Sequence, residues 1–269
     1  VVGTPIGNLS DFSPRAVQTL REVDFIAAED TRVTQKLLSH FQIKKPMISY
    51  YQHNLRERGE EILARIEAGE NCAIATDAGM PCISDPGEDL VGLCAARDIP
   101  TVVIPGPSAA ISALAVSGLP TSRFCFEGFL STNRKNRMEH LHQISGDQHT
   151  LIFYEAPHKL IYTLQDMLEV LGDRRIALCR ELTKLHEEVL RFTLAEAVAY
   201  YEENAPKGEY VLVVAGAAPK TGAVVTLEDG VAQVLALKEQ GMRLKDAAKE
   251  VAEHTGLSKN ELYAAALER

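Results

Sequence analysis

Three loops of this sequence are rich in glycine, proline and small polar residues, the residue types that let a backbone approach a ligand closely. They are Gly3–Leu9, Asp77–Gly87 and Pro105–Ala109. Glycine lacks the side chain that would hold a ligand away, and proline fixes the shape of a loop. Each loop follows or leads out of a predicted strand, and in an open parallel sheet ligands bind beyond the carboxyl ends of the strands. The three loops together therefore predict one binding site at a shared sheet edge.

The sequence excludes the common phosphate-binding loops. It contains no G-x-x-x-x-G-K-[ST] motif and no G-x-G-x-x-G after its first predicted strand. Asp77 and Asp85 would repel phosphate groups, and no plausible set of metal ligands accompanies them. A ligand with hydroxyls and a cationic centre but no phosphate suits acidic and main-chain groups better. S-adenosylmethionine is such a ligand.

The elements that must position these loops are predicted by short apolar segments that alternate with helical patterns, which is typical of βα units and a largely parallel sheet. Predicted strands in the first half are Val1–Gly3, Phe25–Ala28, Met47–Ser49, Cys72–Thr76 and Thr101–Ile104, with helices over Arg56–Ala68, Glu88–Arg97 and Ala109–Ser117. A second set has strands at Phe124–Gly128, Leu151–Tyr154, Ile176–Cys179, Val189–Thr193 and Tyr210–Ala215, with helices over Asn133–Ile144, Lys159–Leu171 and Leu194–Asn204.

This pattern divides the chain into four parts. Residues 1–118 are predicted to form an N-terminal α/β domain with the ligand loops, and residues 119–218 a second α/β domain. Residues 219–226 are expected to be a linker. Residues 227–269 contain no proline and are predicted to form a small helical unit.

Composition narrows the function classes. The chain has 269 residues, of which 46% are hydrophobic and 24% charged, and a net charge of −9. A protein that wraps nucleic acid over its whole surface would be basic, so any such contact must be local. No apolar stretch is long enough to span a bilayer, so no membrane partner is expected.

The five cysteines form no C-x-x-C, which indicates reduced thiols in the cytoplasm and no metal site. His140 and His142 lie two residues apart and face different sides of a helix.

Six segments resemble the tetrapyrrole-methylase-like methyltransferases. They are Gly3–Leu9, Glu29–Arg32, Asp77–Gly87, Pro105–Ala109, Tyr154–Lys159 and Arg180–Lys184. Within that superfamily the resemblance is closest to the bacterial enzymes that methylate the ribose 2′-hydroxyl of a cytidine in small-subunit (16S) rRNA. It spans essentially the whole chain. It implies two α/β domains with S-adenosylmethionine in the interdomain cleft, usually in a homodimer.

The resemblance also implies which residues hold the cofactor. Carried onto this sequence, they are Pro5 of the first loop, Ile83, Ser84 and Asp85 of the second, Ser108 and Ala109 of the third, and Glu155 and Leu182 after second-domain strands. Family members that act on tetrapyrroles have a first loop like G-x-G-P-G, whereas this chain has Gly3-Thr4-Pro5-Ile6-Gly7. That difference favours the members of the superfamily that methylate RNA over those that methylate tetrapyrroles.

A ribose hydroxyl is a poor nucleophile, so such a reaction calls for a nearby base or cation. Glu29, Asp30 and Arg32 follow the second predicted strand, at the edge where the cofactor loops gather. We expect Asp30 or Glu155 to accept the hydroxyl proton and Arg32 to orient a phosphate. The alternative is that Asp30 and Arg32 form only an ion pair that fixes the loop.

Two segments are candidates for RNA contact. Residues 131–137 carry Arg134, Lys135 and Arg137 without an acidic residue, so they offer a basic patch, or else the solvated start of a helix. In the last unit, the helical pattern over 244–254, the turn at 255–257 and the box Ser258-x-x-Glu261 predict a helix-turn-helix-like fold. Its cations Lys245, Lys249 and Lys259 could line an RNA- or ribosome-docking surface, although a packing or dimer-supporting role is the alternative.

Three functions therefore follow from the sequence. The first is a 2′-O-methyltransferase acting on rRNA in an assembled or nearly assembled 30S subunit. The second keeps the fold and cofactor but methylates a tetrapyrrole, which would need neither the basic segment nor the helix-turn-helix. The third is a ligand-sensing transcription regulator. Residues 228–269 contain six Lys and Arg against eight Asp and Glu, a poor balance for binding duplex DNA.

Overall fold

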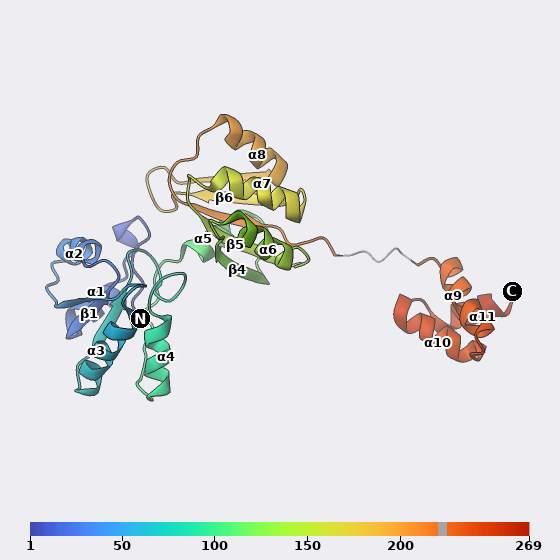
Figure 1. Ribbon diagram of the computed structural model, residues 1–269, viewed down its shortest axis with the longest axis horizontal. Coiled ribbons are helices and arrows are strands. Elements are labelled where there is room, and N and C mark those ends of the chain that lie inside the picture. Colours follow the sequence, from blue (N-terminus) through green and yellow to red (C-terminus); the bar gives the residue numbers. More distant parts are fainter. Residues whose placement is uncertain (220–224, 269) are drawn as a thin grey trace. The chain divides into compact units, whose positions relative to one another are not determined.

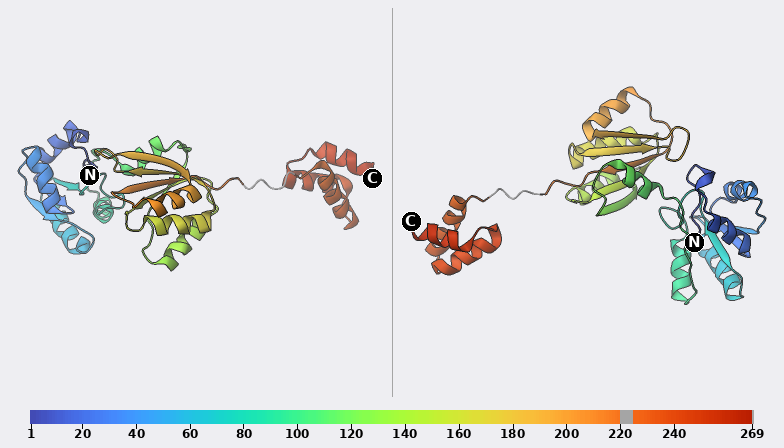
Figure 2. Two further views of the ribbon diagram at one scale, coloured as in Figure 1. Left: turned by 90° about the horizontal axis from the view of Figure 1, so that it is seen from above. Right: turned by 180° about the vertical axis from the view of Figure 1, so that it is seen from behind.

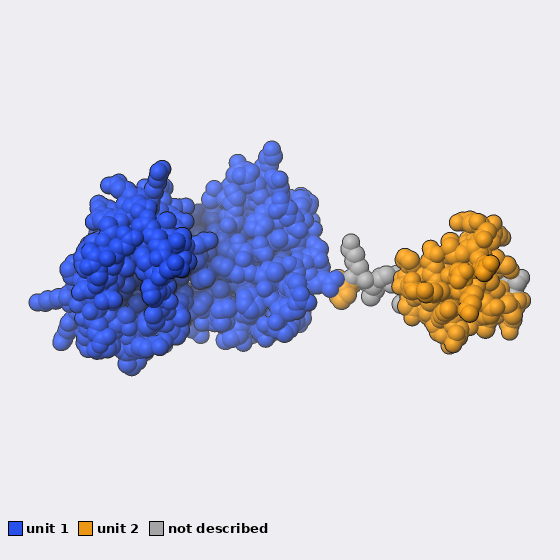
Figure 3. Space-filling model, turned by 90° about the horizontal axis from the view of Figure 1, so that it is seen from below, with its two compact units in different colours: residues 1–217 blue, residues 218–269 orange. Residues whose placement is uncertain are grey.

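A computed structural model describes residues 1–219 and 225–268 (Figures 1 and 2). The chain divides into two compact units, residues 1–217 and 218–269 (Figure 3). The first unit contains both sheets, and the second is helical. Of the linker predicted at residues 219–226, residues 220–224 lie outside the described residues.

The first sheet has three parallel strands in the order β2-β1-β3, with β1 at Phe25–Ala28, β2 at Met47–Ser49 and β3 at Cys72–Ala75. Alternate side chains of β1 enter different cores because successive residues of a strand face opposite sides. Ile26 and Ala28 pack with α1 (Pro14–Glu22) and α2 (Thr31–His40). Phe25 and Ala27 pack with α3 (Leu55–Glu67) and α4 (Glu88–Ala96). A short 3-10 turn, η1 (Leu9–Asp11), precedes α1.

The strands predicted at Val1–Gly3 and Thr101–Ile104 are wrong as full strands. The two segments pair with each other through a single isolated bridge, between Val2 and Ile104. Backbone hydrogen bonds nevertheless place the first segment beside β3, because the Val2 N–H donates to the Ile74 carbonyl, and the second segment beside the first, because the Ile104 N–H donates to the Val1 carbonyl. The prolines that flank Ile104 at positions 100 and 105 carry no N–H, which limits the length of this pairing.

The second sheet has five strands in the order β4-β5-β8-β6-β7. They are β4 (Phe124–Phe129), β5 (Thr150–Glu155), β6 (Arg175–Arg180), β7 (Glu188–Thr193) and β8 (Tyr210–Val214). Only β4 and β5 are parallel, and the other three pairings are antiparallel. The expectation of a largely parallel sheet thus holds for the first sheet but not for the second.

Helices cover both faces of the second sheet (Figure 1). The side chains of α6 (Arg134–Ile144), α7 (Leu160–Leu171) and α8 (Leu194–Glu203) pack on one face. The small side chains Ala110 and Ala113 of α5 (Ala109–Ser117) pack on the other. Although α5 follows the third cofactor loop, it belongs to the core of the second sheet. The domain boundary predicted at residue 118 stays a prediction.

The second unit consists of α9 (Leu227–Glu239), α10 (Leu244–Thr255) and α11 (Lys259–Leu267). Its own small core contains Val234, Val251 and Leu262. Gly256 ends α10 with φ of 73°, and the Ser258 hydroxyl accepts a hydrogen bond from the Glu261 N–H at the start of α11. This hydrogen bond is one of the two that make up the capping box predicted at Ser258 and Glu261. Both hydrogen bonds of a capping box are present at the start of α9, between Thr226 and Asp229.

Candidate active site

The three glycine- and proline-rich loops meet at one edge of the first sheet. The N–H groups of Thr4 and Gly79 each donate to the other's carbonyl, at 2.8 and 3.2 Å. The Gly3 N–H donates to the Ile104 carbonyl just before the third loop. A Cβ on Gly106 would lie 2.8 to 2.9 Å from backbone atoms of Gly3. The first and third loops can therefore approach this closely only because both residues are glycine.

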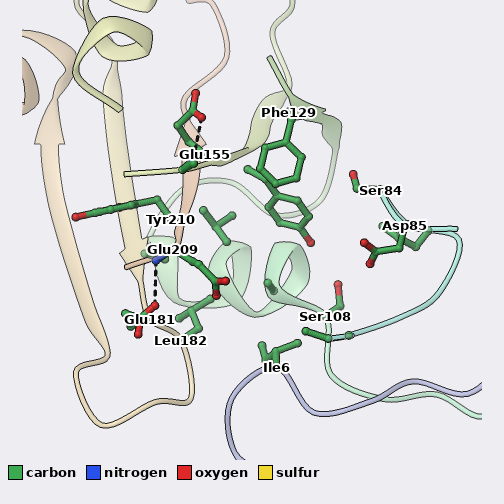
Figure 4. Close-up of a pocket in the computed structure, with 18 of the residues that line it drawn as sticks. Ile6, Ser84, Asp85, Ser108, Phe129, Glu155, Glu181, Leu182, Glu209 and Tyr210 are labelled. Atoms are coloured by element: carbon green, nitrogen blue, oxygen red, sulfur yellow. Dashed lines mark hydrogen bonds between the residues drawn. The ribbon is translucent and has the colours of Figure 1, made fainter. Parts of the chain in front are cut away.

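A cleft of about 490 Å³ opens beside these loops within the first unit (Figure 4). That volume is within the usual range for a small-molecule site. The cleft lies between the loops and one edge of the second sheet, where β4, β5 and β6 end and β8 begins. It is lined by Ile6, residues 78–80, 83–85, 108–109, 154–157 and 209–211, Phe129, Cys179, Glu181, Leu182 and Lys184.

Most of the cofactor residues predicted from the resemblance line this cleft. Ile83, Ser84, Asp85, Ser108, Ala109, Glu155 and Leu182 are all among its lining residues. Pro5 is buried beneath it, and the neighbouring Ile6 forms the wall instead. The aromatic residues Phe129, Tyr154 and Tyr210 also line the cleft and were not predicted as site residues. Tyr154 and Tyr210 lie at the ends of predicted strands and Phe129 directly after one, where side chains reach the sheet edge.

Strained backbone is concentrated around the cleft. Cys82 and Ser84 in the second loop have φ of 72° and 63°, and Glu181 and Thr183 after β6 have φ of 49° and 67°. Left-handed conformations cost energy for residues other than glycine, and they are retained where the surrounding structure, often a functional site, fixes them. The strain supports a binding role for the two loops that face each other across the cleft.

The carboxylate of Glu155 does not point into the cleft. Its side chain is 1% exposed and its carboxylate forms an ion pair with Lys159 at 3.0 Å. It also accepts hydrogen bonds from the Thr163 hydroxyl at 2.5 Å and from the Ala156 N–H at 2.8 Å. Figure 4 shows the carboxylate turned away from the cavity. Glu155 therefore contributes a wall, and its carboxylate is poorly placed to accept a proton from a substrate.

Asp30 and Arg32 form the ion pair that the sequence analysis kept as an alternative. The Arg32 guanidinium donates to both carboxylate oxygens of Asp30, at 3.0 and 2.6 Å. Asp30 is also the N-cap of α2 and accepts the Arg32 N–H. These hydrogen bonds lower the pKa of Asp30 to about 2, which makes it a weak base. Neither residue lines the cleft. Their predicted catalytic roles stay predictions with little geometric support.

Asp85 is the carboxylate with the properties of a base. Its side chain points into the cleft beside Ser84 (Figure 4). Burial, and to a smaller extent the negative charges of Glu29 and Asp77, together raise the pKa of Asp85 to about 7. Burial likewise raises the pKa values of Glu29 and Asp77 themselves. A carboxylate whose pKa lies near neutrality can both accept and return a proton.

The predicted RNA-binding residues of the first unit differ in accessibility. Lys135 is exposed at the start of α6, and Arg134 is 61% exposed although it pairs with Asp166 and Glu169. Arg137 is buried, pairs with Asp166 at 2.7 Å, and donates to the Ser131 carbonyl. The prediction that Arg137 contacts RNA is therefore wrong, because its charge is used inside the protein. In the second unit Lys245 and Lys249 are exposed, and Lys259 is half-buried.

Comparison with known proteins identifies the family of this chain. Residues 1–198 match the family of tetrapyrrole (corrin/porphyrin) methylases, and residues 225–269 match a domain described as the RsmI C-terminal HTH domain. The chain therefore belongs to the tetrapyrrole methylase family. The resemblance and the fold class predicted from the sequence are confirmed.

Curated relatives match over nearly their full lengths. A Synechocystis protein named ribosomal RNA small subunit methyltransferase I is 49% identical over 100% of this chain and 96% of its own length. An Escherichia coli O157:H7 protein of the same name is 44% identical over 100% of this chain and 94% of its own. A Thermotoga maritima protein of that name is 48% identical over 216 residues, 80% of this chain and 97% of its own length. The 216 aligned residues are almost the whole of that relative, and they are about as many as the first unit of this chain contains.

Solved structures confirm the fold at greater distance. The uroporphyrin-III-C-methyltransferase of Thermus thermophilus has a TM-score of 0.56 at 18% identity and covers 79% of this chain and 91% of its own. A diphthine synthase has a TM-score of 0.59 at 14% identity, over 80% and 88%.

The contact of Gly3 with Gly106 yields a direct test. We expect Gly106→Ala to destabilise the protein by about 1–3 kcal/mol, because the new methyl group would overlap the Gly3 backbone and push the first and third loops apart. S-adenosylmethionine affinity should fall with it. Thermal unfolding and calorimetric titration would measure both. Gly92→Ala in α4, where an added Cβ meets nothing within 4 Å, is the matched control and should keep wild-type affinity. Equal behaviour of the two variants would contradict the role of the contact.

Proposed function

We propose that this chain is an S-adenosylmethionine-dependent methyltransferase that modifies small-subunit rRNA at the ribose 2′-hydroxyl of a cytidine. The observation that carries the proposal is the match of both parts of the chain: curated relatives named for small-subunit rRNA methylation align over 94–96% of their own lengths. The match of the second unit to the C-terminal domain of that group separates the chain from methylases of tetrapyrroles.

The cleft fits S-adenosylmethionine by its chemistry. Its walls are largely apolar, from Ile6, Ile83 and Leu182, as suits an adenine ring and the methylene groups of the methionine chain. The hydroxyls of Ser84 and Ser108 and the main-chain groups of the strained loops are suited to the ribose and the amino-acid end. A carboxylate at Asp85 suits a cationic ligand. When bound, the cofactor supplies an electrophilic methyl group, and positioning the two reactants accounts for much of the expected acceleration.

We assign proton acceptance to Asp85. Its carboxylate lies in the cleft, and burial, followed by the acidic groups Glu29 and Asp77, raises its pKa and so strengthens its hold on a proton. Asp85 would accept the proton of the ribose hydroxyl as the new O–CH3 bond forms, and solvent would later remove that proton. The bond between the methyl group and the sulfonium would break in the same displacement, leaving a neutral thioether as the leaving group. Asp85 must be ionised to act, so the rate should rise with pH as its carboxyl loses its proton.

The test of this role is Asp85→Asn. We expect turnover to fall by roughly 10²–10⁴-fold, the usual contribution of a positioned base. In the wild type, kcat/KM should rise as the pH passes through about 7 and then level off. The variant should lose this rise, because asparagine does not titrate. Steady-state kinetics across pH would measure both effects.

Two controls sharpen the Asp85 experiment. Asp89→Asn removes an exposed carboxylate of α4 and should leave the profile unchanged. The S-adenosylmethionine affinity of Asp85→Asn should stay within a few-fold of wild type. A large loss of cofactor affinity with an unchanged pH profile would reassign Asp85 to cofactor binding alone.

Phe129 provides a surface on which a base can stack. Its side chain is 55% exposed where β4 reaches the cleft. The ring packs against Tyr154 with centroids 5.4 Å apart, and the Lys159 ammonium lies 5.7 Å from the centroid of the Phe129 ring. Sequence-specific RNA proteins commonly stack an unpaired base on an exposed aromatic ring, and an enzyme that must reach a nucleotide takes it out of its helix. We propose that Phe129 holds the target nucleotide in this way.

Phe129→Ala should therefore weaken RNA recognition. Stacking of one base is worth about 1–3 kcal/mol, so kcat/KM for the RNA substrate should fall roughly 5- to 150-fold while cofactor affinity stays unchanged. Phe124→Ala is the matched control, since Phe124 is a partly exposed phenylalanine at the other end of the same strand. If both variants lose activity equally, the stacking role is wrong.

Other contacts with the substrate are proposed from accessible cations. Lys135 and Arg134 on α6 and Lys245, Lys249 and Lys259 on the second unit are suited to phosphate contacts, which are electrostatic and weaken with salt. We further propose that the substrate is rRNA within an assembled or nearly assembled 30S subunit, and that the protein acts in the cytoplasm as a homodimer. No helix among the described residues is long and apolar enough to cross a membrane.

The decisive experiment is methyl transfer from labelled S-adenosylmethionine to three acceptors: 30S subunits from a strain without this gene, naked 16S rRNA, and a porphyrinogen. We expect label in one cytidine ribose of the rRNA. A chain ending at Ala217 should keep its cofactor affinity but methylate the subunit more slowly, since it lacks the second unit. Label in the porphyrinogen alone would overturn the substrate, and no label despite cofactor binding would overturn the function.

A further inference from the structure

Three side chains of different chemistry converge at the opposite end of β4 from the cleft. Cys125 lies near the start of β4, and Asp147 and His149 lie in the loop between α6 and β5. The Cys125 Sγ is 3.3 Å from the Asp147 Oδ2 and 3.9 Å from the His149 Nδ1. The His149 Nδ1 is 2.6 Å from the Asp147 Oδ1. One ligand atom from each residue therefore lies within 4.8 Å of the other two.

These distances are close to those of a metal site. Zn²⁺ binds thiolate at about 2.3 Å and imidazole or carboxylate at about 2.0–2.2 Å, and in a tetrahedron such ligands lie about 3.3–3.6 Å from one another. The two distances from the Cys125 sulfur bracket that range. The Asp147–His149 contact is shorter and would open slightly, as a hydrogen bond is exchanged for two bonds to the ion. All three side chains are partly exposed, so an ion has a path in.

We propose that Cys125, Asp147 and His149 bind one Zn²⁺ ion, with water in the fourth position. The charges balance, because a thiolate and a carboxylate together neutralise the dication. Binding breaks the S–H bond of Cys125 and forms a Zn–S bond, and the proton goes to solvent. The imidazole binds through its neutral Nδ1, with its remaining proton on Nε2.

The backbone around the three ligands is already fixed, which lowers the cost of ordering them. The His149 N–H donates to the Asp147 Oδ1 at 2.8 Å, and the Thr150 hydroxyl donates to the Pro120 carbonyl at 2.7 Å. The Ala217 N–H donates to the Asp147 carbonyl at 2.6 Å. Because Ala217 is the last residue of the first unit, the ion would fasten the segment from which the chain leaves that unit.

The site is separate from the cleft. Phe129 lies four positions after Cys125 in β4, which is about 13 Å at the rise of a β-strand. Metal binding and methyl transfer should therefore be independent, and either proposal can fail without the other.

The first test is a Zn²⁺ titration of the full chain in competition with a chromogenic chelator. We expect one ion per chain in the wild type. Cys125→Ser and His149→Gln should each lose on the order of tenfold or more in affinity, since each removes a ligand that metal sites depend on. Cys72→Ser, at a half-buried cysteine outside the cluster, is the matched control and should bind like the wild type. No uptake by the wild type, or equal uptake by Cys125→Ser, would overturn the site.

A second readout identifies the ligands without relying on affinity. With Co²⁺ in place of Zn²⁺, the wild type should show a thiolate-to-cobalt absorption band in the near ultraviolet, and Cys125→Ser should lack it. Zn²⁺ should raise the Tm of the wild type more than the Tm of either variant, because an ion that binds only the folded state stabilises it in proportion to its affinity. Circular dichroism at the start of each experiment checks that the variants are folded. A cobalt complex without the sulfur band would overturn the role of Cys125.

Discussion

The functional site depends on one close contact, the approach of the Gly3 and Gly106 backbones. Hydrogen bonds from Gly3 to Ile104 and between Thr4 and Gly79 join the three loops at the edge of the first sheet. Without that joining, the loops would be separate turns on a small three-stranded sheet. With it, they form one wall, and the loops of the second sheet form the facing wall. The two sheets contribute different chemistry to the cleft: Asp85 and the serine hydroxyls come from the loops of the first, and aromatic rings, together with Glu181 and Glu209, come from the second.

Much of this arrangement could be predicted from sequence because it rests on local chemistry. Glycine and proline mark loops, and alternating apolar runs mark strands, so the loops and most strands were found. Two helices, α1 and α2, were not predicted, although Ser13-Pro14 and Asp30 are typical helix starts. The antiparallel pairing of the second sheet was missed for a different reason. Strand order is set by contacts between distant segments, and strand periodicity is the same for either direction.

The residues of the candidate site likewise fall into those that local sequence predicts and those that depend on distant partners. Residues carried by loop motifs, such as Ser84, Asp85 and Ser108, do reach the cleft, because a motif fixes its own backbone. Residues whose role depends on partners could not be judged from sequence. Glu155 follows a strand as expected, yet Lys159 and Thr163 hold its carboxylate. Arg137 lies in a basic segment, yet Asp166, 29 residues later, buries its charge. The near-neutral pKa of Asp85 also has a distant cause, since Glu29 and Asp77 come from elsewhere in the chain.

The position of β8 has a consequence for how the protein is made. It is the last strand of the first unit, yet it lies in the middle of the sheet, between β5 and β6. A nascent chain that has emerged only as far as β7 holds two separate strand pairs, each with an unpaired edge facing the other. Synthesis proceeds from the N-terminus, so those edges stay open until Tyr210–Val214 leaves the ribosome. The sheet then closes in one step. The three-stranded sheet is complete long before, so the two walls of the cleft mature at different times during translation.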